Sequence, residues 1–148
     1  MTQATADPFE AAVLRFKEAC GADRATLFVH DQQKKEVWSK VALGLEIPEI
    51  RTGTHRGVVG FVARTGQTVN LRDAYNDPRF NRNVDEQTGY RTKSILTMAI
   101  KGGGDRVIGV LQALNKPGMF TPEDEAAMEG CCDELAQLLA TMPETSGA

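Results

Sequence analysis

The sequence predicts an α+β domain in which helices pack to one side of an antiparallel sheet. Three observations support this prediction: two pairs of short apolar segments joined by tight polar turns, an amphipathic helix near each end, and the length of the chain. The chain has 148 residues, which is the size of one ordinary domain. Strands that follow one another through tight turns pair antiparallel, so a single mostly antiparallel sheet is expected.

Composition excludes several classes of protein. The 17 Lys and Arg residues against 20 Asp and Glu residues leave a net charge of −3, which argues against a dedicated nucleic-acid binder. A hydrophobic fraction of 41% is enough for a folded core. The chain shows neither a signal peptide nor an apolar run long enough to cross a membrane, and its three cysteines cannot complete a disulfide framework. We therefore expect a soluble cytoplasmic protein without nucleic-acid or membrane partners.

The first elements are a helix and a hairpin. Apolar residues recur every three or four positions over residues 8–20, with Asp7 as the expected N-cap and Gly21 as the stop. Alternating segments at 25–30 and 37–43 flank the polar turn 31–35 and predict two paired strands.

The middle of the chain is less regular. A short edge strand is expected near Ile50, a helix over 57–65 that ends at Gly66, and a strand over 67–71. The polar stretch 72–91 is predicted to be a loop with one helical turn at 78–81. A loop of this length inside a compact domain is usually functional or disordered.

The last part of the chain predicts a second hairpin and a long helix. Strands are expected at 93–101 and 106–114, around the glycine-rich turn 102–105. Thr121 is the expected N-cap of the final helix, whose apolar face carries Met128, Cys131, Leu135, Leu138 and Met142. Residues 8–142 are expected to form one domain between flexible tails at 1–7 and 143–148.

Several familiar catalytic patterns are missing. His30 and His55 lie outside any metal-binding spacing, and glycines 102–104 join two strands rather than opening a helix around a phosphate. No metal, cofactor or catalytic residue is therefore expected. All three cysteines are expected to be buried structural thiols, and of the adjacent pair one should face the core and the other a flank: Cys20, Cys131 and Cys132.

Two segments carry a functional signal. The helix that begins at Gly57 presents free backbone N–H groups, which can hold an anion, and Arg56 adds positive charge there. Near the C-terminus, a spaced set of five residues resembles the N-K-F-D-E motif of GAF domains: Asn115, Lys116, Phe120, Asp124 and Glu125. Segments 70–75, 77–80 and 84–92 are also similar to the GAF domains of phosphodiesterases and adenylyl cyclases, so the resemblance extends over about residues 8–141.

The resemblance implies a fold and a function. A GAF domain has a five- or six-stranded antiparallel sheet, with helices from both termini on one face and a ligand pocket on the other, under a short helix and a long loop. The implied function is regulatory: binding of a small molecule, with cyclic AMP or cyclic GMP as the first candidates. The signal would pass through the terminal helices of a homodimer to an output domain in a longer protein.

Site residues follow from the resemblance position by position. Backbone amides at Val58 and Val59 would contact the nucleotide at its phosphate, while three loop side chains would line the base and ribose: Asp85, Thr88 and Thr92. Thr26, on the first strand, is a further expected ligand residue and stands where the family often has a small hydroxyl residue. Asn81 stands where the family has a tyrosine near the phosphate, and Gln112 replaces a glutamate of the last strand. Ala42 and Leu43 occupy positions where the family often has an aromatic and an acidic residue that contact the base. Losing such a stack would weaken nucleotide affinity or change the ligand.

The five-residue motif is expected to be structural. A Lys116–Asp124 ion pair would join the end of the last strand to the start of the last helix, with Phe120 filling the gap between them.

Three alternative functions remain. The chain could be a GAF domain that has lost its ligand and only dimerises. It could reduce free methionine sulfoxide, although the cysteines lie on the terminal helices rather than near the pocket. A bilin or haem sensor would need a pocket cysteine or an axial histidine.

Overall fold

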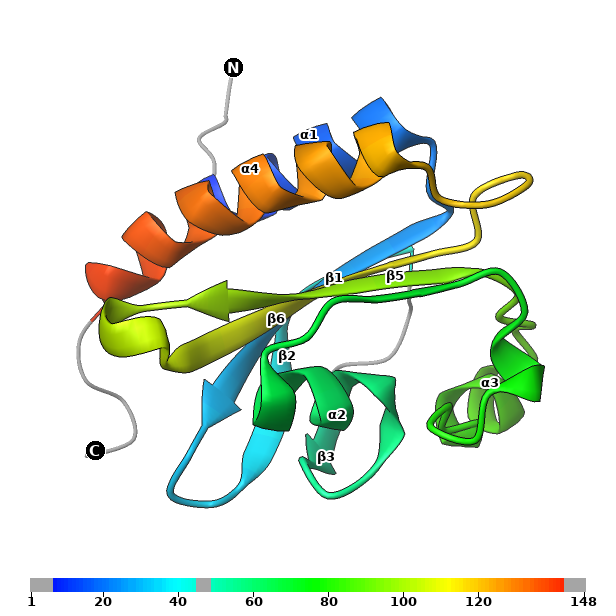
Figure 1. The fold of residues 1–148 in the computed structure, drawn as a ribbon, viewed down its shortest axis with the longest axis horizontal. Coiled ribbons are helices and arrows are strands. Elements are labelled where there is room, and N and C mark those ends of the chain that lie inside the picture. The colour runs from blue at the N-terminus through cyan, green and yellow to red at the C-terminus, as the bar shows by residue number, and fades with distance from the viewer. Residues whose placement is uncertain (1–6, 45–48, 143–148) are drawn as a thin grey trace.

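The structure is a computed structural model that describes residues 7–44 and 49–142. Six strands form one sheet in the order β3-β2-β1-β6-β5-β4, and every neighbouring pair is antiparallel (Figure 1). The strands are β1 (Arg24–Asp31), β2 (Glu36–Leu43), β3 (Arg51–Gly53), β4 (Val69–Leu71), β5 (Ile95–Lys101) and β6 (Val107–Leu114). The α-helices are α1 (Pro8–Cys20), α2 (Gly57–Thr65), α3 (Asn83–Thr88) and α4 (Pro122–Ala140). This arrangement confirms the predicted α+β class; the expected tails lie outside the described residues, apart from Asp7.

Both predicted hairpins are present, with ends that differ from the expected ones by one or two residues. β1 pairs with β2 and with β6, so the two hairpins join at the centre of the sheet. A bulge between Leu27 and Phe28 shifts the β1–β2 register by one residue. At the edges, β3 pairs with β2 and β4 pairs with β5.

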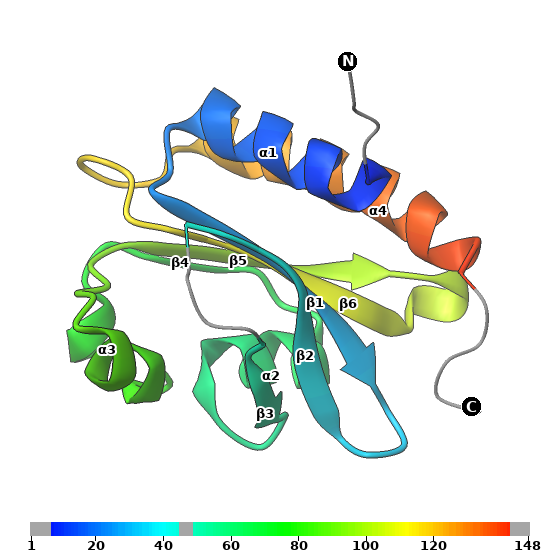
Figure 2. The same cartoon turned by 180° about the vertical axis from the view of Figure 1, so that it is seen from behind.

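The two terminal helices lie side by side on one face of the sheet (Figures 1 and 2). The Asp7 side chain accepts a hydrogen bond from the Phe9 N–H, and Gly21 ends α1 in the left-handed conformation at φ 78°. Between these helices and the sheet lies a hydrophobic core that includes Val13, Leu27 and Leu135, each fully buried. Both ends of the chain therefore contribute to the same core.

The adjacent cysteines of α4 differ from the expectation that one would lie on a flank. Cys131 is 8% exposed and Cys132 is 5% exposed, so both are buried. Successive helix residues point about 100° apart, and α4 is covered on two sides, by α1 and by the sheet. The Cys131 thiol lies 3.6 Å from the carbonyl oxygen of Ala12 on α1.

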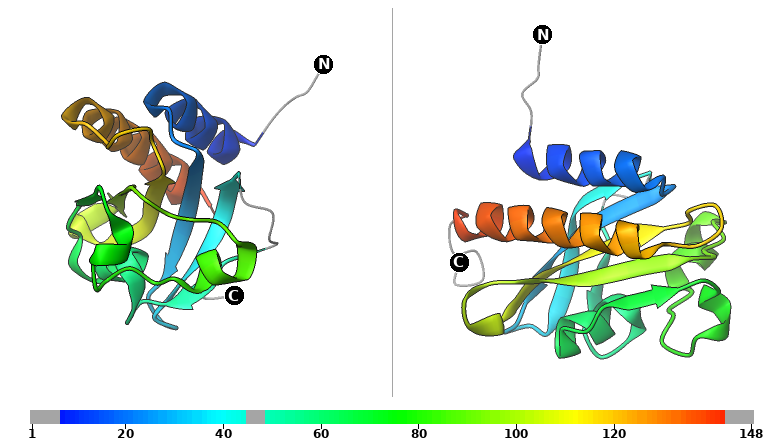
Figure 3. Two further views of the ribbon diagram at one scale, coloured as in Figure 1. Left: turned by 90° about the vertical axis from the view of Figure 1, so that its right-hand side faces the viewer. Right: turned by 45° about the horizontal axis from the view of Figure 1, so that its top comes forward.

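The opposite face of the sheet carries α2, the long loop and α3 (Figure 3). A second core lies under α2, where Val58 and Val62 pack with Phe28 and Val110. The helical turn expected at 78–81 is wrong: a 3₁₀ turn forms before it, at Ala74–Asn76, and α3 forms after it. Local side-chain bonds explain the difference, because Asp77 accepts from the Arg79 N–H and makes an Asx turn there.

Within residues 7–44 and 49–142, no helix has the length and apolar character that a membrane span requires.

Candidate functional site

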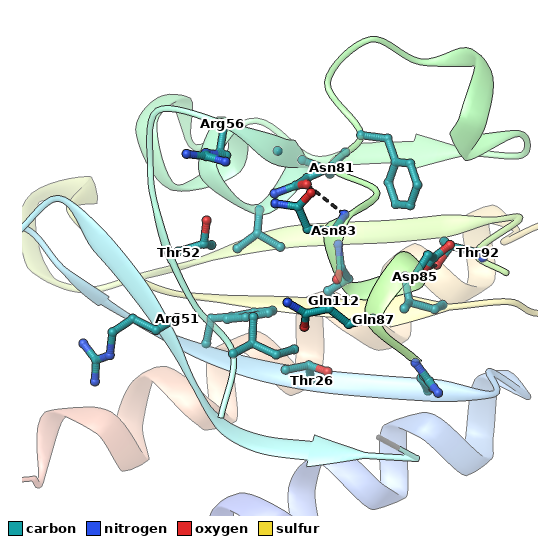
Figure 4. Close-up of a pocket in the computed structure, with 18 of the residues that line it drawn as sticks. Thr26, Arg51, Thr52, Arg56, Asn81, Asn83, Asp85, Gln87, Thr92 and Gln112 are labelled. Carbon is teal, nitrogen blue, oxygen red and sulfur yellow. Dashed lines mark hydrogen bonds between the residues drawn. The ribbon is translucent and has the colours of Figure 1, made fainter. Parts of the chain in front are cut away.

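A cavity of about 300 Å³ lies between the sheet and the segments that cover its free face (Figure 4). Strands β1 and β6 form its floor, the start of α2 forms one wall, and the long loop with α3 forms another. Seven of the eight expected ligand residues line it: Thr26, Val58, Val59, Asn81, Asp85, Thr92 and Gln112.

The eighth expected residue, Thr88, lies outside this lining. It is the last residue of α3, and its hydroxyl accepts a hydrogen bond from the Tyr90 N–H at 3.3 Å. In this structure Thr88 therefore helps to end the helix.

Strand alternation determines which side chains reach the floor. Arg24, Thr26 and Phe28 are spaced two apart on β1 and all line the cavity. Thr26 lies opposite Gln112 on β6, and the Gln112 amide donates to the Thr97 hydroxyl at 3.1 Å. Gln112 is therefore held within the sheet while it faces the cavity.

The same alternation separates positions 42 and 43, where the family often has two residues that contact the base. Ala42 pairs with Thr26 and shares the face of the cavity. Leu43 pairs with Ala25 and packs against the core beneath the terminal helices. Adjacent strand residues point to opposite faces, so at most position 42 can face a ligand.

The start of α2 offers backbone donors to the cavity. Its N-cap, Arg56, makes no side-chain cap, which leaves the N–H groups of the first turn without a partner in the helix. The Val58 side chain is buried in the core below, so its backbone is what it presents to a ligand. Gly57 has φ +79°, and a Cβ there would lie 3.3 Å from the Cβ of Asn81. The close approach and the positive φ both favour glycine.

Asn81 is itself held in place. Its side-chain oxygen accepts from the Asn83 N–H at 3.0 Å and so orders the residues that lead into α3 (Figure 4).

Asp85 anchors the long loop. It is 6% exposed, and its two oxygens accept from the Thr92 N–H at 2.7 Å, the Thr92 hydroxyl at 2.8 Å and the Tyr75 hydroxyl at 2.7 Å. The hydrogen bond to Asp85 raises the pKa of Tyr75. Asp85 and Thr92 thus line the cavity while bonded to one another, which closes residues 75–92 into a compact unit.

Several residues that line the cavity were not expected from the sequence, among them Arg24, Phe80, Asn83 and Gln87. Two signals could have found part of this set. Arg24 lies two positions before Thr26 on the same strand, and Asn83 and Gln87 are four apart on one helix. Figure 4 shows Gln87 and Gln112 in the middle of this view of the cavity.

Asn115, the first residue of the five-residue motif, holds the C-terminal end of the long loop through its side chain. It has φ +62°, and its side-chain oxygen accepts from the N–H groups of Lys93 and Ser94. Its amide donates to the Tyr90 hydroxyl and to the Arg91 carbonyl, both at 2.8 Å.

The expected ion pair of the motif is confirmed. Lys116 Nζ lies 2.5 Å from an Asp124 oxygen, which also accepts from the Thr121 N–H at 2.8 Å in a capping box. Burial alone would raise the pKa of Asp124, but the hydrogen bonds from Lys116 and Thr121 outweigh it and hold this pKa below its usual value. Phe120 is 1% exposed and fills the gap between strand and helix, as expected.

Glu125 completes the motif by accepting from the Asn70 amide at 2.8 Å. None of the five motif residues is among those that line the cavity. Through these contacts the motif joins β4, the end of β6, the loop and α4.

All three cysteines lie in the layer of terminal helices, on the other face of the sheet from the cavity. Burial raises the pKa of Cys131 to about 11 and raises that of Cys132 further. Among the described residues, no group of three or more His, Cys, Asp or Glu side chains could hold a metal ion.

Comparison with known proteins agrees with this architecture. A family model described as the GAF domain matches residues 6–139. A solved GAF domain, from a phosphoenolpyruvate-protein phosphotransferase of Coxiella burnetii, superposes with a TM-score of 0.81 at 25% identity. The superposition covers 91% of this chain and 84% of that one.

Two longer proteins are similar in sequence. "Probable 3',5'-cyclic phosphodiesterase pde-5" of Caenorhabditis elegans is 43% identical over 121 residues, which cover 73% of this chain and 16% of that protein. "Dual 3',5'-cyclic-AMP and -GMP phosphodiesterase 11A" of Takifugu rubripes is 38% identical over 122 residues, covering 73% of this chain and 14% of that protein. The matched segment thus spans 16% and 14% of the lengths of these two relatives. With the family model matching most of its length, the chain belongs to the GAF domain family.

Proposed function

We propose that this domain senses a small molecule by binding a cyclic nucleotide in the cavity between the sheet and α2. The observation that carries the proposal is the uncapped N-terminus of α2, which opens into a cavity with polar side chains on its floor and loop. A helix N-terminus of this kind suits a phosphate. The names of the two similar phosphodiesterases support the same class of ligand.

The charge of the cavity favours an anion. Three arginines and two acids line it, and one of the acids, Glu49, is paired with Arg51 at 2.9 Å. The other acid, Asp85, already accepts three hydrogen bonds from the loop. Arg56 has no ion pair within the described part of the chain, so its charge is available to a phosphate at the start of α2.

The cavity offers aromatic rings on which the nucleotide base can stack, even though position 42 is alanine. Phe80 and Phe28 both line the cavity, and the Phe80 ring lies 5.2 Å from that of Tyr75 in a tilted arrangement. Stacking on such a ring is tolerant of base identity, so Phe80 is the residue that we assign to this contact.

Regulation would pass through the layer of terminal helices. Residues of α1 and α4 share one core with the sheet, so a shift of the sheet on ligand binding changes the helix packing. We propose that these helices form a two-fold dimer interface, since Leu14 is 40% exposed on α1. The wider protein would be a cytoplasmic signalling protein in which this domain controls an output domain and is not itself an enzyme.

The catalytic alternative, reduction of free methionine sulfoxide, needs a thiol beside the substrate. The cysteines of this chain lie in the helix layer instead, which favours the sensor.

Titration calorimetry with cyclic AMP and cyclic GMP tests the proposal, with adenosine and guanosine as controls that lack the phosphate. We expect heat with at least one cyclic nucleotide, little with the nucleosides, and weaker binding in Arg56→Gln. Lys34→Gln, in the exposed turn between β1 and β2, is the matched control and should bind as the unmodified chain does. No heat and no thermal shift with either cyclic nucleotide at millimolar concentration would rule out nucleotide binding.

A further inference from the structure

Arg24 lies at the end of the cavity floor that is farther from α2. It pairs with Leu114, the last residue of β6, whereas Phe28 pairs with Val110 under α2. Four residues of strand separate Arg24 from Phe28, or about 13 Å at a rise of about 3.3 Å per residue. A ligand whose phosphate binds at α2 and which lies along this row would therefore point its other end at Arg24.

The surrounding residues hold the Arg24 guanidinium in one plane. Its Cζ lies 3.4 Å from the centre of the Tyr90 ring. The Tyr90 hydroxyl donates to Asp23 and accepts from Asn115, so two hydrogen bonds fix the hydroxyl end of the ring. A guanidinium stacked in this way has its N–H donors directed outward in the plane of the group.

Arg24 also has unused donor capacity. Its Nε is buried and has no hydrogen-bond partner among the residues that the structure describes. The Nε itself is closed off from solvent, so a ligand in the cavity would be contacted by the terminal N–H groups of Arg24. Arg24 has no ion pair with any described residue, which leaves these terminal donors available to a ligand acceptor.

The chemistry of a guanidinium distinguishes the two purine bases. Its two parallel N–H groups match the O6 and N7 acceptors of guanine, whereas adenine places an amino donor beside N7. We propose that Arg24 contacts the base of the bound nucleotide and makes the pocket select guanine over adenine. This inference rests on the proposed nucleotide binding and adds to it the identity of the base and the residue that selects it.

The test compares ligands and variants by calorimetry on the full chain. We expect cyclic GMP to bind at least about tenfold more tightly than cyclic AMP, in line with the discrimination of one bidentate contact. Arg24→Gln and Arg24→Lys lose the paired donors, so the ratio of the two affinities should fall to within about threefold, mainly through weaker cyclic GMP binding. Arg56→Gln should weaken both ligands by the same factor and keep their ratio, because it acts at the phosphate.

A second test uses a ligand analogue on the unmodified chain, so it does not depend on whether Arg24 variants fold. Cyclic IMP keeps O6 and N7 but lacks the 2-amino group, so it should bind nearly as tightly as cyclic GMP. Binding of cyclic IMP at the level of cyclic AMP would overturn the inference. So would an unmodified chain that prefers cyclic AMP, or Arg24 variants that fold and keep the original ratio. In each of those cases nucleotide binding itself would stand. If no cyclic nucleotide binds the unmodified chain, the proposed function and this inference both fail.

Discussion

Replacing Lys116 with alanine should destabilise the domain without removing a contact to the ligand. Lys116 is 23% exposed and Asp124 is 8% exposed in their side chains, so the ion pair is largely shielded from water. Lys116 does not line the cavity. The effect on any ligand should therefore be indirect, through the position of the loop and the last helix.

The stability lost in Lys116→Ala depends on which hydrogen bonds Asp124 keeps. A hydrogen bond to a charged group contributes about 1.5–3 kcal/mol. In Lys116→Ala the carboxylate stays buried but keeps the N–H of Thr121 as a donor, so we expect a loss of about 2 kcal/mol rather than the larger cost of an isolated buried charge. For a chain of this length that loss lowers Tm by about 4–8 °C.

Urea denaturation followed by circular dichroism measures this loss, with Lys34→Ala as the control in an exposed turn that should change stability by less than about 0.5 kcal/mol. Asp124→Ala should cost more than Lys116→Ala, because it removes both the ion pair and the helix cap. A Lys116→Ala variant that kept its original stability but bound no ligand would refute the structural role and place Lys116 in the binding site.

The Lys116–Asp124 ion pair should also make the stability of the domain depend on pH. The folded-state pKa of Asp124 lies below its ordinary value of 3.8, so its ionised form contributes stability that is fully present above that value. This contribution is lost as the pH falls through the lower folded-state pKa. The stability difference between the unmodified chain and Lys116→Ala should be constant from pH 5 to 7 and shrink below about pH 3.8. A difference that grew in acid would contradict the assignment.

Three further predictions concern the loop, the motif and the thiols. Asp85→Asn should speed cleavage of residues 72–91 by a protease, because the amide cannot accept all three hydrogen bonds; Glu86→Gln, exposed on the same helix, is the control and should not. Asn115→Gly should lower the free energy of unfolding by about 2 kcal/mol from lost hydrogen bonds, and Asn115→Ala by about 1 kcal/mol more, because φ is +62° there; equal losses in urea titrations would show that the backbone is unstrained. Cys131 and Cys132 should react slowly with a thiol reagent at pH 8 in the folded chain and fast in denaturant, because burial raises the pKa of each; a fast native reaction would contradict this.

Local sequence signals were sufficient to predict most of the helices and strands. Asp7 and Gly21 delimit α1 through backbone geometry that depends on a few neighbouring atoms. The capping box of Thr121 and Asp124 is likewise contained within one helical turn. Such features are encoded over short stretches of chain, so they can be identified without knowing the tertiary structure. The loop 72–91 is the exception, since side-chain bonds from Asp77 placed its helical turns on either side of the expected position.

The sequence by itself determined the class of fold, the family and the ion pair of Lys116 with Asp124, because each rests on local spacing or on a motif. Only the tertiary structure decided which residues share the cavity. Leu43 faces the terminal helices, and Thr88 lies outside the residues that line the cavity. Arg24 lies at one end of the cavity floor, stacked on Tyr90. The physical reason is that strand pairing and the closure of a long loop bring together residues far apart in sequence. Arg24 and Tyr90 are 66 positions apart in the chain, and no local pattern relates them.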